Sequence, residues 1–212
     1  MPDYHEPLIP GETYHLFSRA VGNEKLFLSD ENYRYILARL FYHIGPVAEL
    51  YSYSLLPNHF HLVVRIKQSD DVVVHYEMVK RKPYHLMDTD LSDFIMERFS
   101  NWLNGYTKAF NRMFQRKGAL FMDYLKRSHA KDGADLTSFL FYTHKNAVHH
   151  GLTKHIGDWP YDAYNALLSN VPTQLLVNEV MDCFGGREGF IKFHQQPVTL
   201  KNLYWEDDSP NL

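Results

Sequence analysis

The sequence predicts an α+β fold of the ferredoxin-like or RRM-like class, a split βαβ sandwich in which helices cover one face of an antiparallel sheet. Alternating polar and apolar residues indicate strands, and apolar residues at helical spacing indicate helices. The two kinds of segment follow one another in the order β-α-β-β-α-β, which is the order of this fold class. In that topology the first and third strands are central, so the third strand is a rigid place for a site.

The first half of the chain has the clearest signals. They predict strands at residues 13–19, 47–56 and 59–66, and a helix that is capped by Asp30 and ends at Gly45-Pro46. Because only Pro57-Asn58 separates the second strand from the third, these two strands should form an antiparallel hairpin. Residues 68–90 are mostly polar and predict an irregular excursion on the surface.

The second half combines long helical patterns with shorter segments. It predicts a long amphipathic helix at residues 91–114, a strand at 118–126 for which a helix is the alternative, a helix at 136–150 capped near Asp135 or Thr137, and an amphipathic helix around 173–184. We expect residues 1–165 to form the main domain. Residues 166–212 should form a C-terminal helical extension that packs on the same domain.

Composition narrows the possible partners. The chain has 212 residues and a formal net charge of −3, so contact with nucleic acid needs a local basic patch. Residues 108–131 supply one, with seven Lys or Arg against one acid, Asp123, although a solvated helix face is the ordinary explanation of such a run. Cys183 is the only cysteine, which excludes an internal disulfide. With no signal-peptide pattern and no apolar stretch of membrane-span length, we expect a cytoplasmic protein without membrane contact.

Two histidines flank one phenylalanine at the start of the predicted third strand, in the segment PNHFHLVV. Side chains two residues apart on a strand share a face, so His59 and His61 point the same way while Phe60 points to the other face. The two imidazoles can converge on one metal ion. Alternatively, each is a buried histidine that is hydrogen-bonded to its neighbours.

The segment LFYTHKNAVHHG offers a third kind of ligand and a nucleophile on a predicted helix. Tyr142 and Asn146 are four residues apart and therefore share a helix face, where they present a phenol and an amide oxygen. In a chain with fifteen tyrosines, a packed aromatic is the alternative for Tyr142. His144, His149 and His150 fit ordinary positions near a helix end equally well.

Five segments occur together in a defined order between residue 13 and about residue 165: YHLFSRAVGNEKLF, PNHFHLVV, GALFMDYLKR, YTHKNAVHHGL and WPYDAY. This ordered set resembles the IS200-like single-tyrosine (HUH) transposases, and among them the REP-associated tyrosine transposases. Two positions depart from the family pattern, because Ala147 replaces the proline after the asparagine and Thr143 replaces an isoleucine. Neither change removes a reacting group.

The resemblance implies an activity and a set of site residues. Proteins of this family cleave and rejoin single-stranded DNA at hairpin ends through a 5′-phosphotyrosine intermediate. At the matching positions Tyr142 is the catalytic nucleophile, and His59, His61 and Asn146 hold a divalent metal ion, Mg²⁺ or Mn²⁺. The implied partner is single-stranded DNA with hairpins, and both monomers and homodimers occur in the family. The basic residues expected to bind this DNA are Arg19, Lys25, Lys108, Arg112, Arg116, Lys117 and Arg127.

Two other functions remain open at the level of sequence. A protein of the same fold can bind single-stranded nucleic acid without cutting it, because a sheet of this topology can stack bases on aromatic side chains. A hydrolytic zinc enzyme could use His59, His61 and one of His144, His149 or His150. The hydrolase leaves the Tyr-x-x-x-Asn spacing unexplained, and a protein-linked DNA product separates the enzyme from the binding protein.

Overall fold

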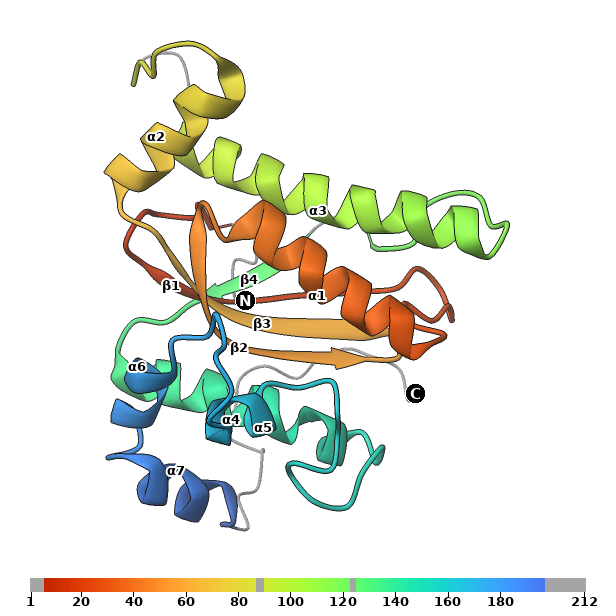
Figure 1. Ribbon diagram of the computed structural model, residues 1–212, viewed down its shortest axis with the longest axis vertical. Coiled ribbons are helices and arrows are strands. Elements are labelled where there is room, and N and C mark those ends of the chain that lie inside the picture. The colour runs from red at the N-terminus through yellow and green to blue at the C-terminus, as the bar shows by residue number, and fades with distance from the viewer. Residues whose placement is uncertain (1–5, 87–89, 123–124, 197–212) are drawn as a thin grey trace.

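The computed structural model describes residues 6–86, 90–122 and 125–196 (Figure 1). The chain forms a four-stranded sheet in the order β2-β3-β1-β4, in which every pair of neighbours is antiparallel. The strands are β1 (Thr13–Arg19), β2 (Ala48–Leu56), β3 (His59–Ile66) and β4 (Lys126–His129). The predicted α+β class is confirmed, and the first and third strands are central as expected.

Helices α1 (Asp30–Ile44) and α3 (Leu91–Met113) cover one face of the sheet (Figure 1). The side chain of Phe60 points to this face, where its ring lies 5.3 Å from the ring of Trp102 on α3. The Trp102 indole donates a hydrogen bond of 3.0 Å to the carbonyl oxygen of Ile36 on α1. Sheet, α1 and α3 therefore share one apolar core, which fixes the position of β3.

The opposite face of the sheet is covered as well, beyond the expectation of helices on one face. Helix α4 (Gly133–His149) packs against β2 and β3, and α6 (Val177–Asp182) contacts β2. The short helix α5 (Tyr164–Leu168) lies on the same side of the sheet, and α7 (Arg187–His194) lies farther from it (Figure 1). As a result β3 is buried at every position except Arg65. Because α4 packs over the face that carries His59 and His61, both histidines are buried.

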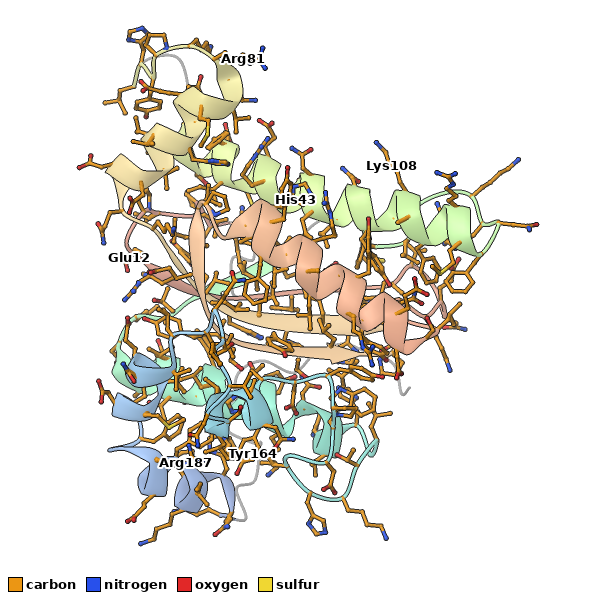
Figure 2. The ribbon with its side chains drawn as sticks, in the orientation of Figure 1. Glu12, His43, Arg81, Lys108, Tyr164 and Arg187 are labelled. Atoms are coloured by element: carbon orange, nitrogen blue, oxygen red, sulfur yellow. The ribbon has the colours of Figure 1, made fainter. Side chains whose placement is uncertain are left out.

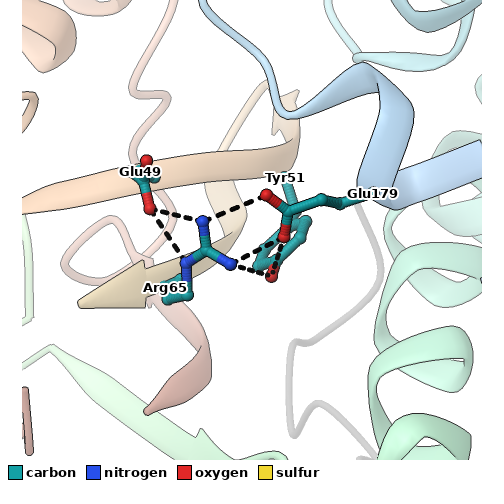
Figure 3. Close-up of polar contacts among 4 residues, drawn as sticks. All are labelled: Glu49, Tyr51, Arg65 and Glu179. Carbon is teal, nitrogen blue, oxygen red and sulfur yellow. Dashed lines mark hydrogen bonds and ion pairs between the residues drawn. The ribbon is translucent and has the colours of Figure 1, made fainter. Parts of the chain in front are cut away.

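The C-terminal helices are attached to the sheet by a polar network around Arg65 (Figure 3). Its guanidinium donates to Glu49 of β2 at 2.6 Å and to Glu179 of α6 at 2.7 Å, and the Tyr51 hydroxyl donates to Glu179 at 3.0 Å. All of these side chains belong to β2, β3 or α6, so the network joins α6 to the main sheet. Helix α5 crosses the expected domain boundary at residue 165, and residues 197–212 of the expected extension lie outside the described part.

Several elements differ from the sequence-based expectations. Residues 69–80 form helix α2 (Ser69–Lys80), not an irregular excursion, and bury Val72 and Tyr76 one turn apart. The fourth strand begins at Lys126 and not at residue 118, although Phe121 forms a single bridge to Ala20. Helix α4 begins at Gly133, where the Asp132 carboxylate accepts from the backbone of residues 134 and 135. The predicted helix around 173–184 is the shorter α6, and residues 87–89 and 123–124 lie outside the described part. None of the described helices has the length and apolarity needed to cross a membrane.

Candidate active site

The face of the sheet under α4 brings the two histidines of β3 together with the two polar residues of α4. His59 and His61 are paired with Arg19 and Phe17 of β1, and their rings lie 5.2 Å apart. The ring of Tyr142 lies 5.3 Å from that of His61, edge to face, and Oδ1 of Asn146 lies 3.4 Å from Nε2 of His59. The structure therefore places all four residues of the predicted metal and catalytic set at one position.

Helix α4 presents Tyr142 and Asn146 to the sheet because they are one turn apart on its buried side. The hydroxyl of Thr143 donates to the carbonyl oxygen of Phe139 within the helix, so this residue stays inside α4 without disturbing its neighbours. With Ala147 in place of a proline, the helix continues without interruption to His149. Gly151 follows with a φ of 69°, a left-handed conformation that suits glycine at the end of a helix.

The orientation of His59 makes the pair His59–Asn146 suitable for a cation. Nδ1 of His59 lies 2.7 Å from Oδ1 of Asn58, and because an amide oxygen only accepts, this nitrogen is the donor. Nε2 then carries a lone pair and faces a second acceptor, Oδ1 of Asn146, at 3.4 Å. Two ligands that are each about 2.1 Å from a metal ion, at angles of 90–110°, lie about 3.0–3.4 Å apart. The donor set and its spacing fit a divalent cation.

His15 of β1 is a member of this cluster that the sequence pattern did not identify. Its Nε2 lies 2.9 Å from Nδ1 of His61, and the two rings stack with their centroids 5.1 Å apart. The ring of His15 also lies 5.9 Å from that of Tyr142. The available signal in the sequence was its spacing from Phe17 and Arg19, which places the three side chains on one face of β1. Only the pairing of β1 with β3 brings His15 to His61.

The cluster is buried, and burial keeps His61 uncharged. His15, His59, His61, Tyr142 and Asn146 are each at most 3% exposed. Burial lowers the pKa of His61 well below its usual value, and the neighbouring histidines lower it further, so the ring is neutral as a metal ligand must be. The side chain of Tyr142 is likewise almost fully buried in this conformation.

The basic residues predicted to bind DNA occupy three different kinds of position. Lys25, Lys108, Arg112 and Lys117 are exposed, and Figure 2 shows Lys108 on α3, across the sheet from α4. Arg116 instead binds the Glu24 carboxylate and, at 2.6 Å, the carbonyl oxygen of Ala119. Arg127 is buried against Met96 of α3.

Two cations lie on the same sheet face as the histidines. Arg19 is the residue of β1 paired with His59. Lys126, which the sequence placed in the basic run but not in the site, lies with its ammonium 5.7 Å from the centre of the Phe17 ring. Because they share this face, Arg19 and Lys126 are candidates for contact with a phosphate close to the histidines.

The zinc-hydrolase arrangement finds no support in the described residues. Among them, no group of three His, Cys, Asp or Glu side chains is placed to hold a metal ion. His144 is hydrogen-bonded to Ser52 and His194, away from His59 and His61. His150 is nearer, with its ring 4.7 Å from that of His59, but it completes no such group.

Comparisons with known proteins agree with the resemblance in the sequence, although no family model matches the chain. A curated relative from Haemophilus influenzae, a putative REP-associated tyrosine transposase, is 25% identical over 119 residues, which are 55% of this chain and 59% of that protein. The matched part thus spans less than two thirds of the relative. A solved structure of a REP-associated tyrosine transposase bound to a REP hairpin has the same fold, with a TM-score of 0.59, 16% identity and coverage of 82% of this chain and 90% of that one. The predicted resemblance to REP-associated tyrosine transposases is confirmed, in sequence over the matched half of the chain and in fold over most of its length.

Proposed function

We propose that the protein is a single-tyrosine DNA transferase that cleaves and rejoins single-stranded DNA at hairpin ends. The observation that carries the proposal is the position of Tyr142 beside His61, with Asn146 beside His59, in one chain. A nucleophile, two imidazoles and an amide oxygen at one position are what a metal-assisted attack on a phosphodiester needs. The similarity to a hairpin-bound transposase supports DNA with hairpins as the substrate.

In this reaction the phenolic oxygen of Tyr142 attacks a backbone phosphorus atom. A bond forms between phosphorus and the tyrosine oxygen, the bond to the 3′ oxygen breaks, and the leaving strand takes up a proton as a free 3′-hydroxyl. The number of phosphodiester bonds is unchanged, so a 3′-hydroxyl of another strand can reverse the step without ATP. Covalent catalysis of this kind divides strand exchange into two similar steps.

The residues around Tyr142 prepare the site for an anionic substrate. A divalent ion, Mg²⁺ or Mn²⁺, held by His59, His61 and Asn146, would supply positive charge at the scissile phosphate. Asn58 contacts Nδ1 of His59, and His15 contacts Nδ1 of His61, so both imidazoles are held in one orientation. A phenol has an ordinary pKa near 10, so charge at the phosphate and correct placement must compensate for a weak nucleophile at neutral pH.

A labelled hairpin oligonucleotide with a single-stranded flank tests the proposal. Incubated with Mn²⁺ or Mg²⁺, the wild-type protein should give a protein-linked labelled band on a denaturing gel, and EDTA should abolish it. Tyr142→Phe and His61→Ala should give no band, whereas Tyr35→Phe, at an exposed tyrosine of α1, should give the wild-type amount. An undiminished band with Tyr142→Phe would remove this tyrosine from the mechanism.

The burial of the cluster favours one alternative, a protein that binds hairpin DNA without cutting it. Tyr142 is 3% exposed and His61 is 1% exposed, so the site is closed in this conformation. The same experiment distinguishes the two functions. A binding protein shifts the oligonucleotide on a native gel but gives no covalent band with either metal ion.

A further inference from the structure

Three buried polar side chains that have no part in the proposed reaction form a hydrogen-bonded chain from the sheet to helix α7. The hydroxyl of Ser52 on β2 lies 2.9 Å from Nε2 of His144 on α4, and Nδ1 of His144 lies 2.9 Å from Nε2 of His194 on α7. Nδ1 of His194 lies 2.7 Å from the carbonyl oxygen of Phe190. Ser52, His144 and His194 are at most 5% exposed, so water does not compete for these hydrogen bonds.

The carbonyl oxygen at the end of the chain fixes the direction of each hydrogen bond. A carbonyl only accepts, so Nδ1 of His194 donates, and in the neutral ring Nε2 accepts from Nδ1–H of His144. Nε2 of His144 in turn accepts from the hydroxyl of Ser52. Burial lowers the pKa of His194 to about 4, which keeps this ring neutral near pH 7. Each ring nitrogen in the chain thus has one partner, and each ring is held in one orientation.

His144 lies on the opposite side of α4 from the candidate active site. Successive residues are about 100° apart around an α-helix, so His144 is about 160° from both Tyr142 and Asn146. The same helix contacts α7 through Phe141, whose ring lies 5.3 Å from that of Phe193 and 5.4 Å from that of His194. Helix α4 is therefore held from both sides, by the strands under the site and by α7.

We propose that His144 and His194 are positioning residues through which α7 fixes the rotation of α4 about its axis. The rotation of α4 decides whether Tyr142 and Asn146 face His61 and His59. If His194 is replaced by an apolar residue, the Nδ1–H of His144 is left buried without an acceptor, and α4 must shift or open to hydrate it. The catalytic part of this inference rests on the proposed function, whereas the placement of α4 can be measured without any reaction.

Amide hydrogen exchange of the full-length protein tests the placement. His194→Leu should raise exchange rates across residues 137–147 of α4 by about 10-fold or more, and His194→Gln, which keeps a donor and an acceptor, should restore them. Glu179→Gln is the matched control, because it weakens the attachment of α6 without touching the histidine chain. Ser52→Ala, at the other end of the hydrogen-bonded chain, should raise the same exchange rates to a smaller extent. It replaces His194→Leu as the test variant if His194→Leu does not fold. If exchange rates in α4 are equal in Glu179→Gln and His194→Leu, the proposal is overturned. If His194→Leu does not fold, unchanged exchange rates in Ser52→Ala overturn it instead.

A single-turnover assay separates positioning from general stability. At saturating hairpin DNA, His194→Leu should slow formation of the covalent band by about 10- to 100-fold with an unchanged dissociation constant for DNA, and His194→Gln should recover most of the rate. A wild-type rate in His194→Leu would refute the catalytic part. If the wild-type protein forms no covalent band, the proposed function fails. The amide hydrogen exchange of the variants then still decides whether His144 and His194 position α4.

Discussion

At the scale of single residues, the candidate site depends on neighbours that orient its ligands. Nδ1 of His59 lies against Asn58 and Nδ1 of His61 against His15, so these neighbours orient both imidazoles. Partners of this kind set the tautomer and the direction of a metal-binding histidine, and losing one weakens metal binding. His15 and Asn58 therefore help to set the geometry of the four predicted residues.

His15 offers a direct test of this dependence. His15→Leu should weaken Mn²⁺ binding by about 10-fold or more, because Nδ1 of His61 loses its buried hydrogen-bond partner. His15→Gln keeps an acceptor and should retain most of the affinity. Titration calorimetry with Mn²⁺ measures both, and circular dichroism checks that the variants are folded. Equal Mn²⁺ affinity in His15→Leu and the wild type would show that His15 only fills space.

Asp162 is expected to make stability depend on pH. Burial raises the pKa of this carboxyl to about 7, although the backbone N–H of Tyr164 donates to it at 3.0 Å. The folded state therefore holds a proton that the unfolded state releases near pH 4, so the free energy of unfolding falls as the pH rises from about 4 to 7. Over that interval the loss is on the order of 3 kcal/mol.

Asp162→Asn removes this titration and keeps an oxygen for the Tyr164 N–H. Its free energy of unfolding relative to the wild type should thus increase steadily from pH 4.5 to pH 8, by about 2–4 kcal/mol in all. Urea denaturation at four pH values measures the difference. A difference between variant and wild type that does not change with pH would mean that folding does not raise the pKa of Asp162.

At the scale of secondary structure, local patterns predicted those elements whose signal is complete in the sequence. The observed bounds of β1 and β3, Thr13–Arg19 and His59–Ile66, are the predicted ones, because alternation and flanking turns coincide there. Helix α2 was missed because it buries only Val72 and Tyr76. The fourth strand was placed too early because Phe121 and other core residues precede it without forming a ladder.

The candidate site shows the same division. Two residues on one strand and two on one helix share a face by local periodicity, so the sequence predicted them as two pairs. The family resemblance predicted that these two pairs converge. The contacts of His61 with His15 and of His144 with His194, which join residues 46 and 50 positions apart, were not predicted. Such contacts depend on strand order and helix packing, which no local pattern contains.

Helix α3 carries two of the exposed cations, Lys108 and Arg112. Their expected effect on DNA binding can be distinguished from the expected effect of the nearby Arg116 on stability. Replacing Lys108 and Arg112 by alanine should leave the melting temperature unchanged, since both side chains are exposed. It should weaken DNA binding and reduce the slope of log affinity against log salt by about 1.4–1.8, the value for two phosphate contacts. Arg116→Ala should instead lower the melting temperature, because its guanidinium binds Glu24 and the Ala119 carbonyl.

Fluorescence anisotropy at several salt concentrations and thermal unfolding measure the two effects. An unchanged salt slope in the double variant would exclude α3 from the DNA-binding surface. A melting temperature for Arg116→Ala equal to that of the wild type would show that these contacts add no stability.

At the scale of the whole molecule, the sheet separates two helix-covered surfaces. Helices α1 and α3 cover one face, and α4 with the C-terminal helices covers the other (Figure 1). Of the basic residues considered, Lys108 and Arg112 lie on the first surface and Arg19 and Lys126 face the second. A ligand that contacts basic residues on both surfaces must pass an edge of the sheet.

One chain contains every residue of the candidate site, so we expect the active site to be formed within a single subunit. A protein with Tyr142→Phe and one with His61→Ala are each expected to be inactive. When they are mixed in equal amounts, no covalent band should appear, because each chain pairs its own α4 with its own β3. If two subunits exchanged α4, about a quarter of the sites in the mixture would combine an intact Tyr142 with an intact His61. The band would then appear on the His61→Ala chain, which a size tag identifies, and its appearance would contradict assembly within one chain.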